Sequence, residues 1–190
     1  ISAGERCLAI VGTHGFRVQG RDVGVVLYAA RGDRPDVATL DALHRERALE
    51  GQLRTWRYVM GGCTVAWLYG EADAPEQGLQ VLAALGDAEY GGFYGSEVYR
   101  VEGELRRRIA PQAPDDAARC FQRAIDFARR RGLRSFELRA ATSLARLWRD
   151  QGRREDARRA LADVYGWFTE GLDTQDLRAA KALLDELAPG

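Results

Sequence analysis

The sequence predicts an all-α fold, a right-handed superhelical solenoid of antiparallel helix pairs. Three observations predict it. Apolar residues recur with helical spacing in stretches of 12 to 18 residues. Alternating runs joined by Asn-Gly or Asp-Gly turns, which would indicate strands, are absent from the sequence. Two distant segments share one residue pattern without a gap. With 46% hydrophobic residues in 190, the chain can also bury a sizeable core.

Helix ends are marked by glycine and proline. Glycines that follow a basic last turn suit the left-handed cap of a helix, at Gly32, Gly132 and Gly152. Pro35, Pro75 and Pro114 suit a first helical turn. We also expect Asp173-Thr174 to open the last helix. These signals predict helices over residues 2–14, 18–31, 35–50, 55–71, 75–85, 92–109, 115–131, 135–151, 154–169 and 174–188. The connections are short, so neighbouring helices should run antiparallel.

A repeat follows from two matching segments. One reads Val65-Ala66-x-x-Tyr69 and then, after eight residues, Gly78-x-x-x-Leu82-x-x-Leu85. The other reads Leu144-Ala145-x-x-Trp148 and then, after eight residues, Ala157-x-x-x-Leu161-x-x-Val164. The small residue of the first helix lets the second helix approach, and the aromatic residue fills the gap between them. This is similar to the tetratricopeptide arrangement.

Two further copies of the repeat are weaker. In one, Gly103 takes the small position, and Arg106 stands in the aromatic slot. In the other, the pattern is carried by Val25, Tyr28 and Val37. The small-residue anchors lie near 25, 66, 103 and 145, with spacings of 41, 37 and 42. We therefore predict one repeat domain over 1–190, cut from a longer protein, with a partial unit at 1–16, repeats at 17–53, 54–90, 91–132 and 133–171, and a capping helix at 172–190.

From residue 97 to 187 the sequence resembles a bacterial family, the repeat region at the C-terminal end of large predicted ATPases of the adenylate or guanylate cyclase type. The resemblance is carried by Tyr99-Arg100-Val101-Glu102-Gly103-Glu104-Leu105, by Cys120-Phe121 with Ala124-Ile125, by the run Glu137 to Trp148, and most specifically by Val164-Tyr165-Gly166-Trp167-Phe168-Thr169-Glu170-Gly171 with Asp173-Thr174. It implies that cyclase and ATPase domains precede this region. The chain itself contains no Gly-x4-Gly-Lys phosphate loop.

The sequence gives no sign of chemistry in this part of the protein. Cys7, Cys63 and Cys120 are far apart, so we expect buried thiols rather than disulfides or a metal site. We expect His14 at a helix end and His44 on a solvated helix face, neither of them catalytic. Acidic residues on predicted helices face arginines, as in the pairs Glu102–Arg106, Glu104–Arg108 and Glu155–Arg159. We therefore predict no enzymatic activity, no cofactor and no metal.

Charge and hydropathy limit the partners. The 28 basic residues balance the 28 acidic ones, which argues against nucleic-acid binding. All basic residues except Lys181 are arginine. The longest apolar run, residues 23–30, is far shorter than the ~20 residues a membrane-spanning helix needs. Free cysteines and the lack of a signal peptide predict a cytoplasmic location.

The concave groove of the solenoid is the predicted working surface. Its candidate binding residues share a position on the first helix of each pair and are Trp67, Arg100, Arg107, Arg139, Thr142, Arg146 and Arg149. Arg139, Thr142, Arg146 and Arg149 form one helical stripe, and Met60 and Cys63 extend the apolar end near Trp67. Arginine forks suit carboxylates, so we expect an acidic peptide or partner domain, for a protein-interaction or signal-sensing module. Two alternatives stay open: a sensor of a small ligand such as an inducer or nucleotide, and an ordinary solvated face with Trp67 in the core.

Overall fold

The computed structural model describes residues 36–38, 40–42, 56–86, 92 and 94–188. Within these ranges the chain is α-helical and contains no strand, as the sequence predicts. The predicted helices 2–14 and 18–31, most of 35–50, Gly32, Cys7, His14 and His44 lie outside the described residues. The described part of 36–42 is helical apart from its first residue. No helix among the described residues is long and apolar enough to cross a membrane.

The chain divides into two compact units, residues 1–86 and 87–190, which are described separately. In the first unit, α4 (Trp56–Glu71) packs on α5 (Pro75–Leu85). Both helices match their predicted bounds within one residue, and Pro75 opens α5 as expected. The helices approach closely at Gly62, where a Cβ atom would lie 2.5 Å from Cδ2 of Leu85. Ala66, the predicted small anchor, is fully buried.

The second unit contains α6 (Gly95–Ile109), α7 (Asp115–Arg130), α8 (Arg134–Asp150), α9 (Arg154–Tyr165) and α10 (Gln175–Leu187). Most bounds agree with the predicted ones. Two bounds differ by three or more residues. Helix α6 begins at Gly95 rather than 92, because Gly92 has a φ of +56°. Helix α9 ends at Tyr165 rather than 169, and the chain turns through Gly166 into a loop.

The predicted glycine caps at Gly132 and Gly152 are confirmed. Their φ angles are +66° and +76°, in the left-handed region that favours glycine. After α7, the N–H of Leu133 donates to the carbonyl of Ala128 at 2.9 Å, and the N–H of Gly132 donates to that of Arg129 at 3.2 Å. This pair of bonds is the Schellman motif. The same two bonds recur after α8, so both helices end where the sequence places their glycines.

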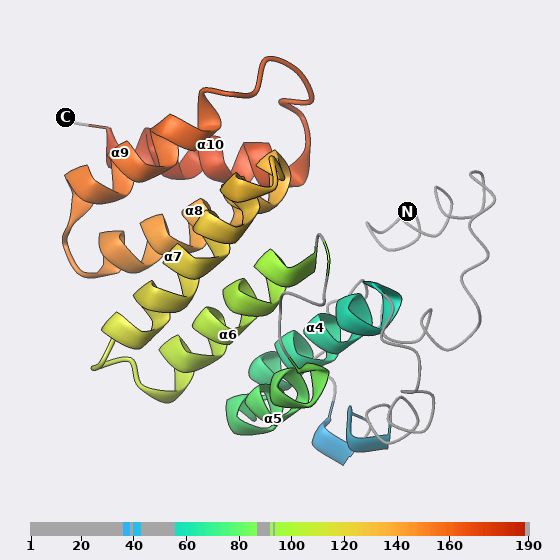
Figure 1. Ribbon diagram of the computed structural model, residues 1–190. Coiled ribbons are helices and arrows are strands. Elements are labelled where there is room, and N and C mark those ends of the chain that lie inside the picture. The colour runs from blue at the N-terminus through green and yellow to red at the C-terminus, as the bar shows by residue number, and fades with distance from the viewer. Residues whose placement is uncertain (1–35, 39, 43–55, 87–91, 93, 189–190) are drawn as a thin grey trace, which may run out of the picture. The chain divides into compact units, whose positions relative to one another are not determined.

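The helices of the second unit form two layers. α6, α8 and α10 lie in one layer and contact each other in that order, while α7 and α9 pack against them from the other side (Figure 1). Each helix also packs against the next one along the chain. The turns after α6, α7 and α8 are short, so consecutive helices run antiparallel there, and α6, α8 and α10 point the same way.

Small and aromatic residues form the core between these layers. A Cβ atom on Gly103 of α6 would lie 2.5 Å from the ring of Phe121 on α7, so the bare glycine backbone makes room for a buried ring. Ala145 of α8 and Ala157 of α9 are fully buried, as are Leu161 and Ala180. Small residues therefore stand where helices of the second unit approach each other most closely.

Candidate functional site

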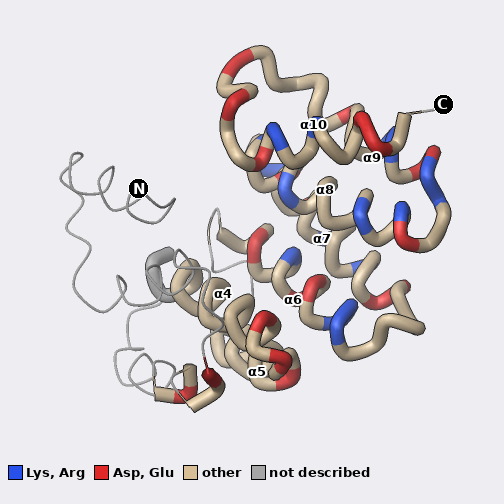
Figure 2. Tube along the Cα trace, turned by 180° about the vertical axis from the view of Figure 1, so that it is seen from behind, with Lys and Arg blue, Asp and Glu red and all other residues tan. Residues whose placement is uncertain are grey.

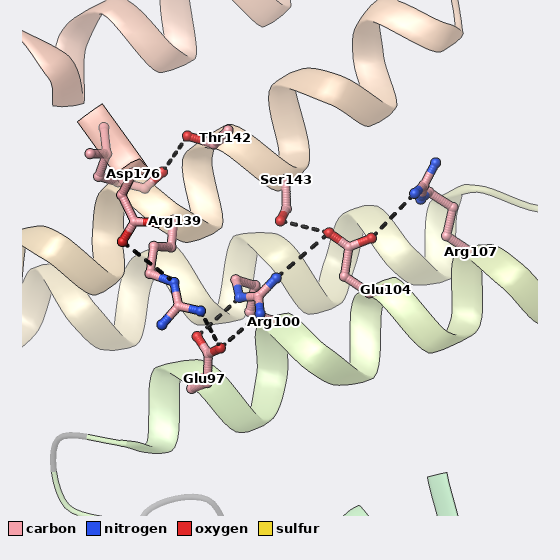
Figure 3. A network of polar contacts seen from close by, with 9 residues as sticks. Glu97, Arg100, Glu104, Arg107, Arg139, Thr142, Ser143 and Asp176 are labelled. Carbon is pink, nitrogen blue, oxygen red and sulfur yellow. Dashed lines mark hydrogen bonds and ion pairs between the residues drawn. The ribbon is translucent and has the colours of Figure 1, made fainter. Parts of the chain in front are cut away.

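Six of the seven predicted binding residues lie in the second unit. Arg100 and Arg107 are on α6, and Arg139, Thr142, Arg146 and Arg149 are on α8. Trp67 is on α4 of the first unit, where it is half-buried beside the fully buried Val65 and Ala66. Four of these six, Arg100, Arg107, Arg139 and Arg149, pair with carboxylates in a network of charged contacts between α6, α8 and α10, part of which Figure 3 shows. We call this network the charge lattice.

Glu97, at the start of α6, is the most buried carboxylate of the charge lattice, with 7% of the residue exposed. Its Oε1 lies 2.7 Å from Nη2 of Arg100 and 2.9 Å from Nη2 of Arg139. Burial by itself raises the pKa of Glu97, but the charge and hydrogen bonds of Arg100 and the charge of Arg139 outweigh it and leave the pKa below its ordinary value. Glu97 is therefore a charged carboxylate at neutral pH that joins α6 to α8.

Glu104, two turns further along α6, collects three partners. The hydroxyl of Ser143 on α8 donates to Oε1 of Glu104 at 2.7 Å. Arg100 lies 3.7 Å from Oε1, and Arg107 lies 3.4 Å from Oε2 (Figure 3). The hydrogen bond from the buried Ser143 to Glu104 thus links α8 to α6. The predicted Glu104–Arg108 pair is wrong, because Glu104 bonds instead to Ser143, Arg100 and Arg107.

The lattice continues to the ends of the helices. Arg107 of α6 lies 3.6 Å from Asp150 of α8. Arg149 contacts Asp150 at 2.8 Å and reaches Glu186 of α10 at 3.1 Å. The hydrogen bond to Asp150 raises the pKa of Arg149 above its ordinary value, against the opposing effect of burial. Contacts near the helix starts and near the helix ends confirm that α6, α8 and α10 run in the same direction.

Two residues of the predicted groove face, Thr142 and Cys63, are buried. Thr142 is buried, and its hydroxyl donates to the carbonyl of Leu138 at 2.8 Å, so it does not face solvent. Cys63, expected beside Trp67, is also buried. Cys63 and Cys120 are buried thiols outside any disulfide, as expected.

The arginines of the predicted stripe divide into paired and unpaired side chains. Arg100, Arg107, Arg139 and Arg149 all bond to carboxylates. Arg146 is exposed, and within the described part of the chain no carboxylate forms an ion pair with it. The sequence spacing did not reveal these acidic partners, because Glu97, Asp176 and Glu186 come from other helices. Of the three ion pairs predicted from the sequence, the Glu102–Arg106 pair is confirmed, at 2.7 Å.

The surface ion pairs of α9 differ from the expected ones by one step. Glu155 bonds to Arg158 at 2.9 Å, and Arg159 bonds to Asp156 at 2.8 Å, in place of a Glu155–Arg159 pair. Both are pairs at a spacing of three, on an exposed face. Such pairs contribute little to stability, because solvent screens them and ordering the side chains costs entropy.

The described residues form many ion pairs, and we examined them for a metal site and for a reactive thiol. Among them, no group of three or more His, Cys, Asp or Glu side chains is arranged to hold a metal ion. Burial raises the pKa of the Cys120 thiol to about 11, with the nearby carboxylate of Glu102 acting in the same direction. This thiol is therefore protonated at neutral pH and is a poor nucleophile. The arrangement suits recognition of a charged group.

No family model, curated protein or solved structure compared with this sequence gives a match. The resemblance to the repeat region of cyclase-type ATPases therefore remains a prediction from the residues quoted above.

Proposed function

We propose that this chain is a tetratricopeptide-like solenoid that binds an acidic peptide or partner domain, as the interaction or sensing module of a larger bacterial ATPase or cyclase-type regulator. The right-handed superhelix and the four repeats are part of this proposal. The binding face is the surface of α6 and α8, within the second unit, that carries the arginines of the charge lattice.

The spacing of the lattice contacts supports the repeat. Ser143 bonds to Glu104 across 39 residues, and Arg149 bonds to Glu186 across 37. These values fall beside the anchor spacings of 41, 37 and 42 in the sequence. Every second helix of the second unit points the same way, which is what stacked helix pairs produce.

Arg146 is the single observation that carries the binding proposal. It is exposed and has no ion-pair partner in the described part of the chain, on a helix whose neighbouring arginines, Arg139 and Arg149, are fixed by carboxylates. A guanidinium presents paired donors that match a carboxylate. Arg107 and Arg139, each with more than a third of the side chain exposed, can add a second contact to the same ligand.

A charge reversal tests this proposal. The probe is a fluorescent peptide of alternating Glu and Leu, with the matching Lys and Leu peptide as the charge control. We expect the Arg146→Glu variant to bind the acidic peptide about tenfold more weakly, because an attraction becomes a repulsion. Arg119→Glu is the matched control, since Arg119 is an exposed arginine on α7 in the other layer.

Two results would contradict the assignment. One is equal affinity of the wild-type protein and the Arg146→Glu variant for the acidic peptide. The other is an equal loss of affinity in the Arg146→Glu and Arg119→Glu variants, because it would indicate attraction by overall charge rather than by this face. Fluorescence anisotropy measures both affinities.

A further inference from the structure

The loop between α9 and α10, residues 166–174, exposes two large apolar side chains. Trp167 is 64% exposed and Leu172 is 48% exposed. Apart from Ile109, these are the large hydrophobic residues exposed in the described part of the chain. Exposing this much apolar surface to water is unfavourable. Tryptophan is also the residue most enriched among those that dominate binding energy at interfaces. The proposed acidic-peptide face does not use this loop.

Trp167 is held in place from one side. The guanidinium of Arg134, at the start of α8, lies 3.9 Å from the centre of the Trp167 ring. Nη1 of Arg134 in turn lies 2.8 Å from Oε2 of the buried Glu137, whose other oxygen accepts a hydrogen bond from Arg129 at 2.9 Å. A ring already fixed on one face loses little conformational freedom when a partner covers the other face.

The rest of the loop is anchored as well. Phe168 is half-buried and packs against the hydrophobic core of the second unit. The N–H of Thr174 donates to the carbonyl of Gly171 at 2.9 Å, and Gly171 has a φ of +65° that suits this turn. The loop therefore presents Trp167 and Leu172 from a defined backbone.

The loop is acidic in an arginine-rich chain. Glu170 and Asp173 are exposed, and neither forms an ion pair within the described residues. Asp176, just after the loop, is reached by Arg139 at 3.8 Å. The sequence has no basic residue between Arg159 and Arg178. Figure 2 shows the same distribution, with red and no blue along the loop between α9 and α10. Arg134 beneath the ring shares the carboxylate of Glu137 with Arg129, so its positive charge is offset only in part.

We propose that Trp167, Glu170, Leu172 and Asp173 form a second interaction surface, the Trp167 surface, which binds a basic segment of a partner protein. An apolar side chain of the segment covers Trp167 and Leu172, and its Lys or Arg residues pair with Glu170 and Asp173. The charge preference is opposite to that of the arginine face of α6 and α8, so the two surfaces select different partners.

Selection from a displayed library of random peptides tests the proposal on the full chain. We expect the enriched peptides to combine basic with large apolar residues. Their affinity should fall about tenfold in the Trp167→Ala variant, as for an aromatic residue central to an interface. It should fall by a smaller factor in Glu170→Gln and in Asp173→Asn, and it should weaken as ionic strength rises. Trp167→Tyr, which keeps an aromatic ring, should retain most of the binding.

Two controls separate this surface from its alternatives. Arg146→Glu should leave the affinity for these peptides unchanged, so failure of the arginine face and failure of the Trp167 surface are distinguishable. Acrylamide quenching, compared between the wild-type protein and Trp167→Phe, should show that Trp167 is open to solvent. Thermal unfolding followed by circular dichroism should show that the Trp167→Ala variant is folded.

Several outcomes would overturn the proposal. They are a selection that enriches no peptide, or only peptides without basic residues, and peptide binding that survives Trp167→Ala. A Trp167 shielded from acrylamide would mean that the chain itself covers the ring. Self-association in sedimentation velocity that disappears in the Trp167→Ala variant would mean that a second copy is the occupant.

Discussion

The helix pairs α4–α5 and α6–α7 use the same kind of close contact but carry different surfaces. Both place a glycine of the first helix against a large side chain of the second, Gly62 against Leu85 and Gly103 against Phe121. The sequence of α4 contains only two charged residues, whereas that of α6 contains seven. Figure 2 shows α4 as almost uniformly tan and α6 as alternating red and blue. Close packing of a helix pair thus depends on small residues and leaves the outer surface free to vary.

The charge lattice distinguishes α6 from α4, which has only two charged residues, and removal of the buried carboxylate of the lattice is the largest expected effect. Glu97→Ala leaves the guanidinium of Arg100, whose side chain is 13% exposed, without its closest partner. We expect a loss of about 3 kcal/mol in the free energy of unfolding, as for other broken buried pairs. Chemical denaturation measures it. Glu155→Ala, on an exposed pair of α9, should change nothing measurable, and equal effects of the two variants would show that the lattice does not stabilise the unit.

The pH dependence of Glu97 sharpens the same point. Its folded-state pKa lies below the ordinary value, so its contribution to stability is present above pH 4.5 and is lost as pH falls below that value through the folded-state pKa. The stability difference between the wild-type protein and Glu97→Gln should therefore shrink as the solution is acidified. Unfolding curves at a series of pH values test this. A difference that stays constant down to the most acidic pH at which the protein folds would contradict the assignment.

A matched pair of glycine substitutions compares the two units directly. In Gly103→Ala the new methyl group meets the fully buried ring of Phe121, while in Gly62→Ala it meets the end of the Leu85 side chain. Overpacking costs about 1–3 kcal/mol, against a gain of up to about 1 kcal/mol from replacing glycine in a helix. We expect Gly103→Ala to be destabilising and Gly62→Ala to be close to neutral, because a leucine adjusts more easily than a packed ring. Thermal unfolding decides, and a reversed order would mean that the ring moves freely.

Arg139 and Arg146 provide a smaller comparison within one helix. Arg139 bonds to buried Glu97, whereas Arg146 has no ion pair among the described residues. We expect Arg139→Ala to lower the free energy of unfolding by about 1 kcal/mol, since its side chain is partly exposed, and Arg146→Ala to change it by less than about 0.5 kcal/mol. Urea denaturation distinguishes them. If the two losses were equal, Arg146 would have a structural partner and would be a poorer candidate for binding.

The thiols of Cys63 and Cys120 give a chemical comparison without a stability effect. Cys120, with its pKa raised to about 11, should resist iodoacetamide in the native protein at neutral pH and react once the chain is unfolded in urea. Cys63, which is also buried, should be protected in the same way. Peptide mass spectrometry resolves the two sites. Rapid native labelling of Cys120 would show that α7 opens readily.

The sequence by itself determined the all-α class and the glycine caps at Gly132 and Gly152. It also predicted α4, α5, α7, α8 and α10 to within one residue at each end. These features follow from periodicity, proline and glycine, which act over a few neighbouring residues. The sequence also pointed to the small residues Ala66, Gly103 and Ala145, which lie 37 and 42 residues apart and are buried in the structure.

Only the tertiary structure decided which partner each charged residue has. The partners of Arg139 and Arg107 are Glu97 and Asp150, about forty residues away, and no local pattern specifies such a pairing. Thr142 is buried, and its hydroxyl bonds to the carbonyl of Leu138, although the helical stripe placed it beside exposed arginines. Trp167 stays exposed because Gly166 ends α9 early and Arg134 holds the ring from one side. Local chain chemistry set the helices, and the packing of helices distant in sequence set the surfaces available for binding.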